Sequence, residues 1–343
     1  MADFTPGPTG TDEVLFAVDG SLGRVLLNRP RAINSLTRDM VVAMRAQLEA
    51  WAEDPQVQTV SIEGAGERGL CAGGDVRAVR EAHLAGTSGG VDFWADEYVL
   101  DAQIAEYPKP VVAVMDGIVM GGGLGISMFA TARWATERSR IAMPETIIGF
   151  FPDVAATYLL SRAPGETGTH VALTGTTITG ADAVALGLAD AVVDSARLPD
   201  LLAGIAAGNP VEPVPEDATT KADTLTSARG WIDECYAGDD AAAIVERLRA
   251  HDAPEARAAA EKISLRSPLS VAVTLEALRR AATAGSVREV LETDTVVARG
   301  LLQRADFAEG VRAQLVDKDR SPRWQHESVS DVTRAEVLAV FSG

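Results

Sequence analysis

The stretch from Lys109 to Asp153 decides how this chain is expected to fold. It reads KPVVAVMDGIVMGGGLGISMFATARWATERSRIAMPETIIGFFPD. It begins with a short apolar run typical of a buried strand, and a glycine cluster follows at positions 121–123 and 125. Strand, glycine turn and helix in that order leave unpaired N–H groups at a helix start, where the helix dipole favours negative charge. The stretch therefore predicts a socket for an anion or a transient oxyanion.

Strand and helix signals alternate outward from this stretch, between Val57 and Val193. Thr37 and Asp75 each precede an apolar-periodic segment, where a side-chain oxygen caps a helix well. The pattern indicates a layered α/β core. The expected elements are a loose tail at 1–13, a hairpin of 14–18 and 24–28 around Asp19-Gly20, helices 37–54, 76–83, 93–105 and 153–160, and a strand 57–62.

The last third of the sequence has a different composition. Residues 204–227 form a polar connection with three prolines, and residues 228–284 and 287–303 are rich in helix formers. We therefore expect two parts: an α/β core with the active site at 1–205, and a helical C-terminal region at 206–343.

Composition excludes several classes of function. The formal net charge of −18 disfavours nucleic acid or an anionic membrane as a partner, and local basic residues would have to hold an anionic substrate. No apolar run approaches the roughly 18 to 20 residues that span a bilayer. The first residues lack a secretory pattern, and two distant cysteines suggest no disulfide framework. We expect a cytoplasmic protein.

Several catalytic motifs are absent or out of context. Residues 86–90, GTSGG, match GxSxG but follow a predicted helix, whereas a nucleophile elbow needs a strand before it. The glycine cluster does not complete GxGxxG, and the four histidines lack the spacing of metal ligands. Ser–His catalysis, dinucleotide cofactors and a metal site are therefore disfavoured.

Two glycine-rich turns remain, at residues 71–75 (CAGGD) and 120–123 (MGGG), each between a strand signal and a helix signal. If they lie side by side, one amide from each forms a two-donor oxyanion hole, in which each donor contributes about 100- to 1,000-fold to a rate. The alternative is that both are only tight turns at points of close packing.

Two carboxylates follow in the same stretch. Glu145 precedes a mostly apolar segment, and an apolar pocket raises the pKa of a carboxyl group so that it can act as base or nucleophile. Asp153, eight positions on, is able to reach the same cavity. The alternatives are a solvated loop position for Glu145 and an N-cap of the next helix for Asp153.

These residues together resemble the crotonase, or enoyl-CoA hydratase/isomerase, superfamily, and most closely its 3-hydroxyisobutyryl-CoA hydrolase branch, thioesterases of valine catabolism. The resemblance covers nearly the whole chain. The matching motifs are NRPRAINSL from Asn28, LCAGGDVR from Leu70, DEYVL from Asp96, KPVVAVMDGIVMGGGLG from Lys109, MPETIIGFFPDVAATYLL from Met143, ALTG from Ala172 and DFAEGVRAQLVDKDRSPRW from Asp306.

The resemblance implies a crotonase-like spiral of ββα units followed by a helical region, and a site that takes an acyl-CoA with no cofactor beyond it. The implied oxyanion amides are those of Gly74 and Gly122, and the implied catalytic carboxylates are Glu145 and Asp153. The resemblance also implies a set of substrate-binding residues: Glu97, Ala72, Asp75, and Arg29 or Arg31 near the CoA phosphates.

Gly125 separates the branches of this superfamily. Hydratases carry a catalytic glutamate two residues after the glycine triplet, and here that position has no side chain. We therefore expect hydrolysis of a short β-hydroxyacyl-CoA. The alternatives are an enoyl-CoA hydratase or isomerase, and a non-catalytic acyl-CoA-binding protein. The sequence leaves open the acyl group and the oligomeric state, for which a homo-oligomer is one option.

Overall fold

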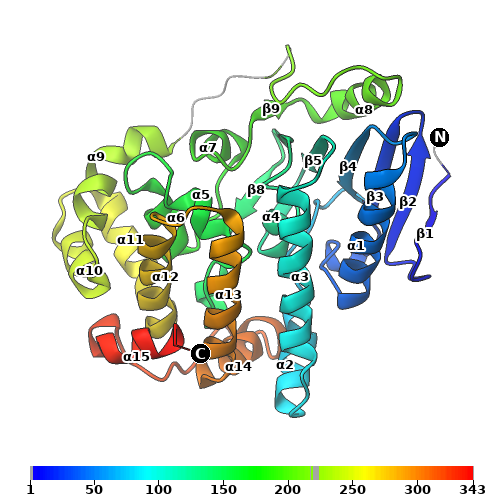
Figure 1. Ribbon diagram of the computed structural model, residues 1–343. Helices are drawn as coiled ribbons and strands as arrows, with labels where there is room; N and C mark the ends of the chain where they lie inside the picture. Colours follow the sequence, from blue (N-terminus) through cyan, green and yellow to red (C-terminus); the bar gives the residue numbers. More distant parts are fainter. Residues whose placement is uncertain (1–2, 217, 219–223, 343) are drawn as a thin grey trace. The chain divides into compact units, whose positions relative to one another are not determined.

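The computed structural model describes residues 3–216, 218 and 224–342 (Figure 1). Its contacts divide the chain into two compact units. Unit 1 comprises residues 1–75, 96–141 and 178–223, and unit 2 comprises residues 76–95, 142–177 and 224–343.

This division differs from the boundary expected at residue 205. Two segments of the expected core, 76–95 and 142–177, cluster with the C-terminal helices instead, and residues 206–216 stay with the sheet. The physical reason is aromatic packing within unit 2. The Trp94 ring stacks on Phe150 at 4.6 Å between centroids and meets Phe307 edge-on at 5.7 Å.

Unit 1 is built on a sheet that has seven strands in the described residues, in the order β1-β2-β3-β4-β5-β7-β9 (Figure 1). The first three strands pair antiparallel, and each later neighbour pairs parallel. The strands are β1 (Thr5–Pro6), β2 (Val14–Asp19), β3 (Leu22–Leu27), β4 (Thr59–Gly64), β5 (Val111–Met115), β7 (Ala132–Thr136) and β9 (Ala191–Val193). The α/β class is confirmed.

The apolar character of the strands explains the sheet. All five residues of β5 are buried, as a parallel strand covered on both faces requires. On one face Leu22, Val112 and Trp134 pack with Leu198 and Leu202 of α8 (Leu198–Ala206). The expected hairpin is confirmed as β2–β3, whereas the expected loose tail contains β1.

Helix α1 (Arg38–Glu53) begins where the sequence predicts. The Thr37 hydroxyl accepts a hydrogen bond from the Met40 amide at 3.3 Å. Helix α3 (Gly89–Ala105) begins four residues earlier than expected, and Asp96 on it pairs with Arg38 and Arg45 of α1 at 2.7 and 2.6 Å. These two ion pairs fix the register of α3 against α1.

The glycine cluster follows β5 through a short second sheet. This sheet pairs β6 (Ile118–Met120) with β8 (Arg140–Ala142), and the four-residue α4 (Gly122–Gly125) comes directly after β6. The predicted order of strand, glycine turn and helix is therefore confirmed.

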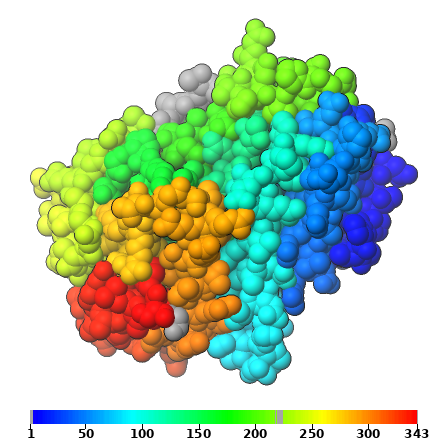
Figure 2. All heavy atoms as spheres, in the orientation of Figure 1, coloured from blue at the N-terminus to red at the C-terminus, as the bar shows by residue number. Residues whose placement is uncertain are grey.

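Unit 2 is mainly helical, as expected for the last third of the chain. Figure 2 shows its C-terminal residues, in red, lying against the yellow and orange helices, which matches the contacts of α15 with α12 and α13. Its helices are α2 (Val76–Leu84), α5 (Ala156–Leu160), α6 (Thr167–Thr174), α9 (Leu225–Tyr236), α10 (Ala241–Ala250), α11 (Pro254–Ser264), α12 (Pro268–Ala281), α13 (Val287–Leu302), α14 (Ala305–Val311) and α15 (Arg334–Val340).

The helix expected to begin at Asp153 starts later. Helix α5 begins at Ala156, its N-cap is Ala155, and no side chain caps it. The expectation that Asp153 caps this helix is therefore wrong. Both Val154 and Ala155 have positive φ, so the chain turns sharply between Asp153 and the helix. Within the described ranges, no helix has the length and apolar character needed to cross a membrane.

A buried histidine of unit 2 gives a testable pH dependence. The Nδ1 atom of His170 lies 2.8 Å from the Tyr236 hydroxyl, and Trp231 meets the His170 ring edge-on. Burial, with a smaller effect of the charge on Lys262, lowers the pKa of His170 to about 4. Between about pH 6.5 and pH 4 the unfolded chain therefore binds a proton that the folded chain does not.

The free energy of unfolding should fall over that range as pH falls, by at most about 3 kcal/mol from this group. Urea unfolding of the wild type and of His170→Asn, across about pH 4 to pH 7, measures it. The variant should lose less stability on acidification, because its side chain does not titrate. Parallel curves for the two proteins would contradict the prediction.

Candidate functional site

The two glycine turns of unit 1 lie side by side. The Cys71 amide donates to the Ile118 carbonyl at 3.1 Å, and the Met120 amide donates to the Cys71 carbonyl at 2.9 Å. Gly73 has φ +101°, and a Cβ there would lie 3.3 Å from the Met120 carbonyl oxygen and 3.7 Å from the Gly122 nitrogen. The neighbouring arrangement that an oxyanion hole requires is present.

The amides of Gly74 and Gly122 are available as donors. Gly122 is the first residue of α4, and the N–H of a first helical residue has no acceptor inside its own helix. In the part of the chain that the structure describes, no acceptor takes the N–H of either residue. The arrangement is able to donate two hydrogen bonds to one ligand oxygen, and this role stays a prediction.

Glu97 of α3 lies against the second turn. A Cβ on Gly122 would come within 2.1 Å of the Glu97 Oε1 atom and 3.2 Å of the Leu36 side chain. The Glu97 residue is 2% exposed. A methyl group at this position would displace the buried Glu97 carboxylate, and the structure brings Glu97 next to Gly122, an expected oxyanion residue.

The NRPRAINSL segment is bonded to the first turn by its backbone. The Ala72 amide donates to Ile33, the Leu36 amide to Gly73, and the Asp75 amide to Leu36, each at 2.9 Å. These bonds fix the turn next to this loop, which by the resemblance lines the CoA adenine and phosphate site; that role stays a prediction.

Asn34 supports the same loop and was missed in the sequence. It is fully buried with φ +54°, and its side-chain amide donates to the carbonyls of Ala65 and Gly69 at 3.1 and 3.0 Å. Its Oδ1 atom accepts from the Arg29 amide at 3.0 Å. A signal for Asn34 was present in the sequence, because asparagine in a loop that also contains proline indicates a turn.

The two candidate phosphate ligands differ in their surroundings. The Arg29 guanidinium pairs with Asp75 at 3.2 Å and with Glu13 at 3.1 Å, whereas Arg31 is exposed. Arg29 thus already holds Asp75, another predicted substrate-binding residue, and Arg31 is the more accessible cation of the two.

Cys71 is not a nucleophile. Burial raises the pKa of its thiol to about 12, so the thiolate that would react is not formed near neutral pH. The Sγ atom instead accepts from the Gly73 amide at 3.3 Å. The cysteine shapes the turn.

Glu145 of unit 2 begins the 3₁₀ helix η2 (Glu145–Ile148) and is 7% exposed. The alternative of a solvated loop residue is therefore wrong. The carbonyl of Glu145 accepts from the Phe150 amide at 3.0 Å, which folds the chain back over the helix. At Gly149, with φ +73°, a Cβ would lie 2.3 Å from the Asp306 carbonyl oxygen, so α14 packs directly on this turn.

The C-terminal motif that begins at Asp306 supports η2. Asp306 is 2% exposed and accepts from the Ser267 hydroxyl at 2.6 Å and the Gln325 amide at 2.8 Å. The Ser267 amide in turn donates to the Thr146 carbonyl at 3.1 Å. The residues from Asp306 onward thus fix the backbone next to Glu145, which explains why both motifs occur in one resemblance.

Asp153 is 5% exposed, and Val154 and Ala155 after it have φ values of +53° and +57°. For residues other than glycine this conformation costs about 1–2 kcal/mol each. The Ala155 amide donates to Asp294 Oδ2 of α13 at 2.8 Å. Asp294 was not predicted from the sequence, although a carboxylate on the apolar stripe of residues 287–302 is a signal that points to it.

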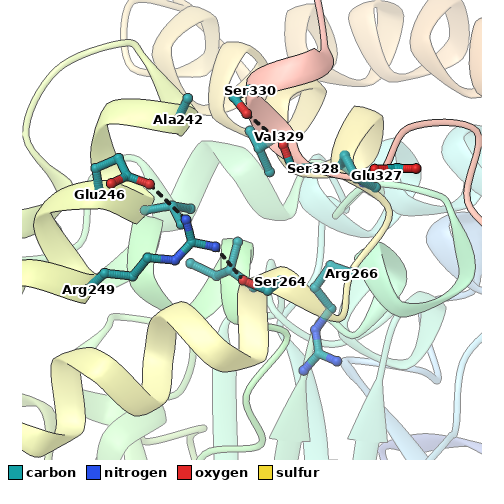
Figure 3. Close-up of a pocket in the computed structure, with 12 residues that line it drawn as sticks. Ala242, Glu246, Arg249, Ser264, Arg266, Glu327, Ser328, Val329 and Ser330 are labelled. Carbon is teal, nitrogen blue, oxygen red and sulfur yellow. Dashed lines mark hydrogen bonds and ion pairs between the residues drawn. The ribbon is translucent and has the colours of Figure 1, made fainter.

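A separate hollow of about 100 Å³ lies in unit 2, between α10, α11 and the loop before α15 (Figure 3). The Arg249 guanidinium on its wall donates to Glu246 at 2.7 Å and Ser264 at 3.2 Å. Arg266 donates to the Thr174 carbonyl. Both cations are held by acceptors of the protein itself, and none of the expected site residues is among the described residues that line this hollow.

The expected site residues thus form two sets. Unit 1 brings together Gly74, Gly122 and Glu97 with the loop that carries Arg29, and unit 2 buries Glu145 at the start of η2 and Asp153 before α5. The first set is suited to polarise a carbonyl group, and the second is suited to base or nucleophilic catalysis. Their action on one substrate stays a prediction.

Known proteins resemble the chain over nearly all of its length. A family model described as Enoyl-CoA hydratase/isomerase matches residues 22–341. Proteins named 3-hydroxyisobutyryl-CoA hydrolase, mitochondrial, are 38% identical in Gallus gallus (94% of this chain, 86% of that protein) and 36% identical in Homo sapiens (95% and 87%).

Two solved structures also match, each with a TM-score of 0.92. A carnitinyl-CoA dehydratase from Mycobacterium thermoresistibile is 46% identical, with 97% of each chain covered. An enoyl-CoA hydratase from Rhodobacter sphaeroides 2.4.1 is 39% identical, with 96% of this chain and 97% of that chain covered. The expected fold class is confirmed.

The contact between Gly122 and Glu97 predicts a specific double-mutant result. Gly122→Ala should destabilise the protein by about 1–3 kcal/mol, because the new methyl group meets the buried carboxylate. Adding Glu97→Ala should remove part of that cost, which gives a coupling energy of about 1 kcal/mol or more in urea unfolding.

Gly230→Ala is the matched control. Gly230 lies in α9, and no atom lies within 4 Å of a Cβ placed there. This exposed helical site should gain about 0.5–1 kcal/mol from alanine. Additive effects of Gly122→Ala and Glu97→Ala would contradict the close approach.

Proposed function

The chain belongs to the enoyl-CoA hydratase/isomerase family, and on that premise we propose that it hydrolyses the thioester of a short β-hydroxyacyl-CoA. 3-Hydroxyisobutyryl-CoA is the foremost candidate substrate, because relatives that cover most of the chain are named for that reaction. The observation that carries the proposal is the pair of buried carboxylates, Glu145 and Asp153, together with the absence of a side chain at Gly125.

A second candidate function is hydration or dehydration, which the names of the two similar solved structures favour. In the hydratases that this family includes, a second glutamate lies two residues after the glycine triplet. Gly125 occupies that place here, inside α4, and is buried. A hydratase with half of its acid–base pair is chemically implausible, so hydrolysis is favoured. A non-catalytic acyl-CoA-binding protein is disfavoured by the two buried carboxylates.

In the proposed mechanism, the N–H groups of Gly74 and Gly122 donate hydrogen bonds to the carbonyl oxygen of the thioester. Negative charge builds on that oxygen as the carbonyl carbon is attacked, and each fixed donor contributes about 100- to 1,000-fold. Glu145 either attacks the carbon, forming a mixed anhydride and releasing the CoA thiolate, or takes a proton from an attacking water. Asp153, as a carboxylate, orients the water and relays to the departing thiolate a proton that this water loses.

Substrate selection is assigned to residues of unit 1. Glu97 accepts a hydrogen bond from the 3-hydroxyl group of the acyl chain, and the segment from Asn28 to Leu36 receives the CoA nucleotide. Arg31 meets a CoA phosphate, because Arg29 is engaged by two carboxylates. Such a local cation is needed since the net charge of −18 repels anionic CoA at long range.

The proposal includes three further points. CoA enters as part of the substrate, and no other cofactor takes part. The compartment is the cytoplasm, although the relatives' names include the word mitochondrial. The active species is a homo-oligomer or a monomer, which gel filtration distinguishes.

A thiol-release assay tests the proposed reaction. With 3-hydroxyisobutyryl-CoA, 3-hydroxypropionyl-CoA, isobutyryl-CoA and crotonyl-CoA supplied side by side, free thiol should appear with the first two. One methyl group separates them, so their kcat/KM values should differ by only about 10- to 200-fold. Isobutyryl-CoA lacks the hydroxyl and should react far more slowly. Hydration of crotonyl-CoA without thiol release would refute the proposal.

The role of Glu145 gives a second prediction. Glu145→Gln removes the base or nucleophile and should lower kcat by about 100- to 10,000-fold, with the folded structure kept because the amide has the same shape. Single turnover in heavy-oxygen water then separates the two routes in the wild type. Label in the Glu145 carboxylate indicates an anhydride that water opens at the glutamyl carbon. Label only in the product indicates attack by water at the acyl carbon, either of the thioester directly or of the anhydride. Unchanged turnover of Glu145→Gln would contradict both routes.

A further inference from the structure

We propose that Asp294 is a positioning residue for Asp153: from α13 it holds the turn at Val154 and Ala155 that aims the Asp153 side chain. The inference rests on the proposed function, in which Asp153 acts beside the reacting thioester. Sequence motifs do not point to Asp294, which lies 139 residues after Ala155.

The contact itself is short and fully enclosed. The Ala155 N–H donates to Asp294 Oδ2 at 2.8 Å, and Asp294 is 1% exposed. Asp294 lies on the buried face of α13, next to Leu291 and Val297 in the helical repeat. Burying a carboxyl group on such a face costs free energy of folding unless the group is hydrogen-bonded. The bond to Ala155 supplies a partner for Asp294.

The turn that Asp294 holds is unfavourable by itself. Val154 and Ala155 both have φ in the left-handed region, and Val154 is β-branched, the residue type least suited to it. Helix α5 begins immediately after this turn, and its N-cap residue, Ala155, has no side chain that could cap the helix. The bond to Asp294 replaces that cap, and the Ala156 amide closes the turn on the Asp153 carbonyl at 2.8 Å.

Loss of this bond leaves a buried N–H without an acceptor and lets Val154 return to an extended conformation. The Ala156 amide bonds to the Asp153 carbonyl across this turn at 2.8 Å, so a rearrangement of Val154 and Ala155 breaks a bond that fixes the Asp153 backbone. The reacting geometry therefore depends on Asp294, although Asp294 itself does not touch the substrate.

The charge state of Asp294 fits this role. Burial and the nearby charge of Asp153 raise its pKa well above the ordinary value, while the Ala155 amide opposes them. A protonated acid accepts the Ala155 N–H without placing a second negative charge beside Asp153. Asparagine has the same shape and the same neutral acceptor, so it should substitute for Asp294.

The test is a series of variants assayed for thiol release. Asp294→Asn should keep kcat within about threefold. Asp294→Ala should lower kcat by about 10- to 100-fold with KM changed less than about threefold, because binding uses other residues. Adding Ala155→Gly to Asp294→Ala should recover most of the loss, since glycine adopts the left-handed conformation without strain.

Asp182→Ala is the matched control. Asp182 is also a buried carboxylate that caps a helix, through Thr179, and it lies on α7 (Gly180–Ala185) of unit 1. This variant should lose stability and keep kcat. A wild-type kcat in Asp294→Ala, or a loss that Asp182→Ala matches, would overturn the proposal. If Asp294→Ala does not fold, Asp294→Ser replaces it with an intermediate loss of kcat expected, and an unchanged kcat again overturns the proposal.

Wild-type turnover separates this proposal from the proposed function. If the wild type releases no thiol from any of the four acyl-CoA compounds, the proposed function fails. Hydrogen exchange of the Ala155 amide then tests the contact directly: Asp294→Ala should exchange at least about tenfold faster there than wild type, and Asp294→Asn should not. Equal exchange rates of the Ala155 amide in all three proteins would show that Asp294 does not stabilise the turn, and would refute the proposal.

Discussion

Unit 1 depends on the backbone pairing between the turn at 71–75 and the strand β6. Two hydrogen bonds, from Cys71 to Ile118 and from Met120 to Cys71, set the distance between the two glycine turns. At Gly123, a Cβ would lie 2.5 Å from the Cys71 carbonyl oxygen, so no other residue allows this pairing. The donors of Gly74 and Gly122 are fixed before any ligand arrives, which is what a preorganised oxyanion site requires.

Unit 2 follows the same physical rule with different elements. Backbone meets backbone at Gly149 and at Gly310, where a Cβ would lie 2.3 Å from Asp306 and 2.4 Å from Ile148. A segment near the C-terminus therefore determines the shape of the turn that carries Glu145. This contact explains why the motif that begins at Asp306 accompanies the motif that carries Glu145, and why the unit includes residues 142–177.

The sequence predicts those features that local chemistry determines. Short patterns predict the Thr37 cap, the β2–β3 hairpin, the α2 helix and the two glycine turns, whereas the pairing of the two turns comes from backbone bonds between distant segments. Features that depend on distant packing are not predictable in this way. The boundary expected at residue 205 assumes that neighbours in sequence cluster in space, but the stacking of Trp94 on Phe150 draws early segments to the C-terminal helices.

Around Asp153 the chain departs from the local preferences of its residues. A cap residue before an apolar segment predicts a helix start at Asp153, yet two left-handed residues intervene. A carboxylate on the apolar stripe of α13 contradicts the helical pattern until its bond to Ala155 is seen. The left-handed turn and the buried carboxyl group of Asp294 each cost stability where they occur. The two features explain each other, because the buried carboxyl group accepts the hydrogen bond that stabilises the strained turn. The carboxylate on the apolar stripe is visible in the sequence, but its partner 139 residues away is not, because the two departures compensate each other only in three dimensions.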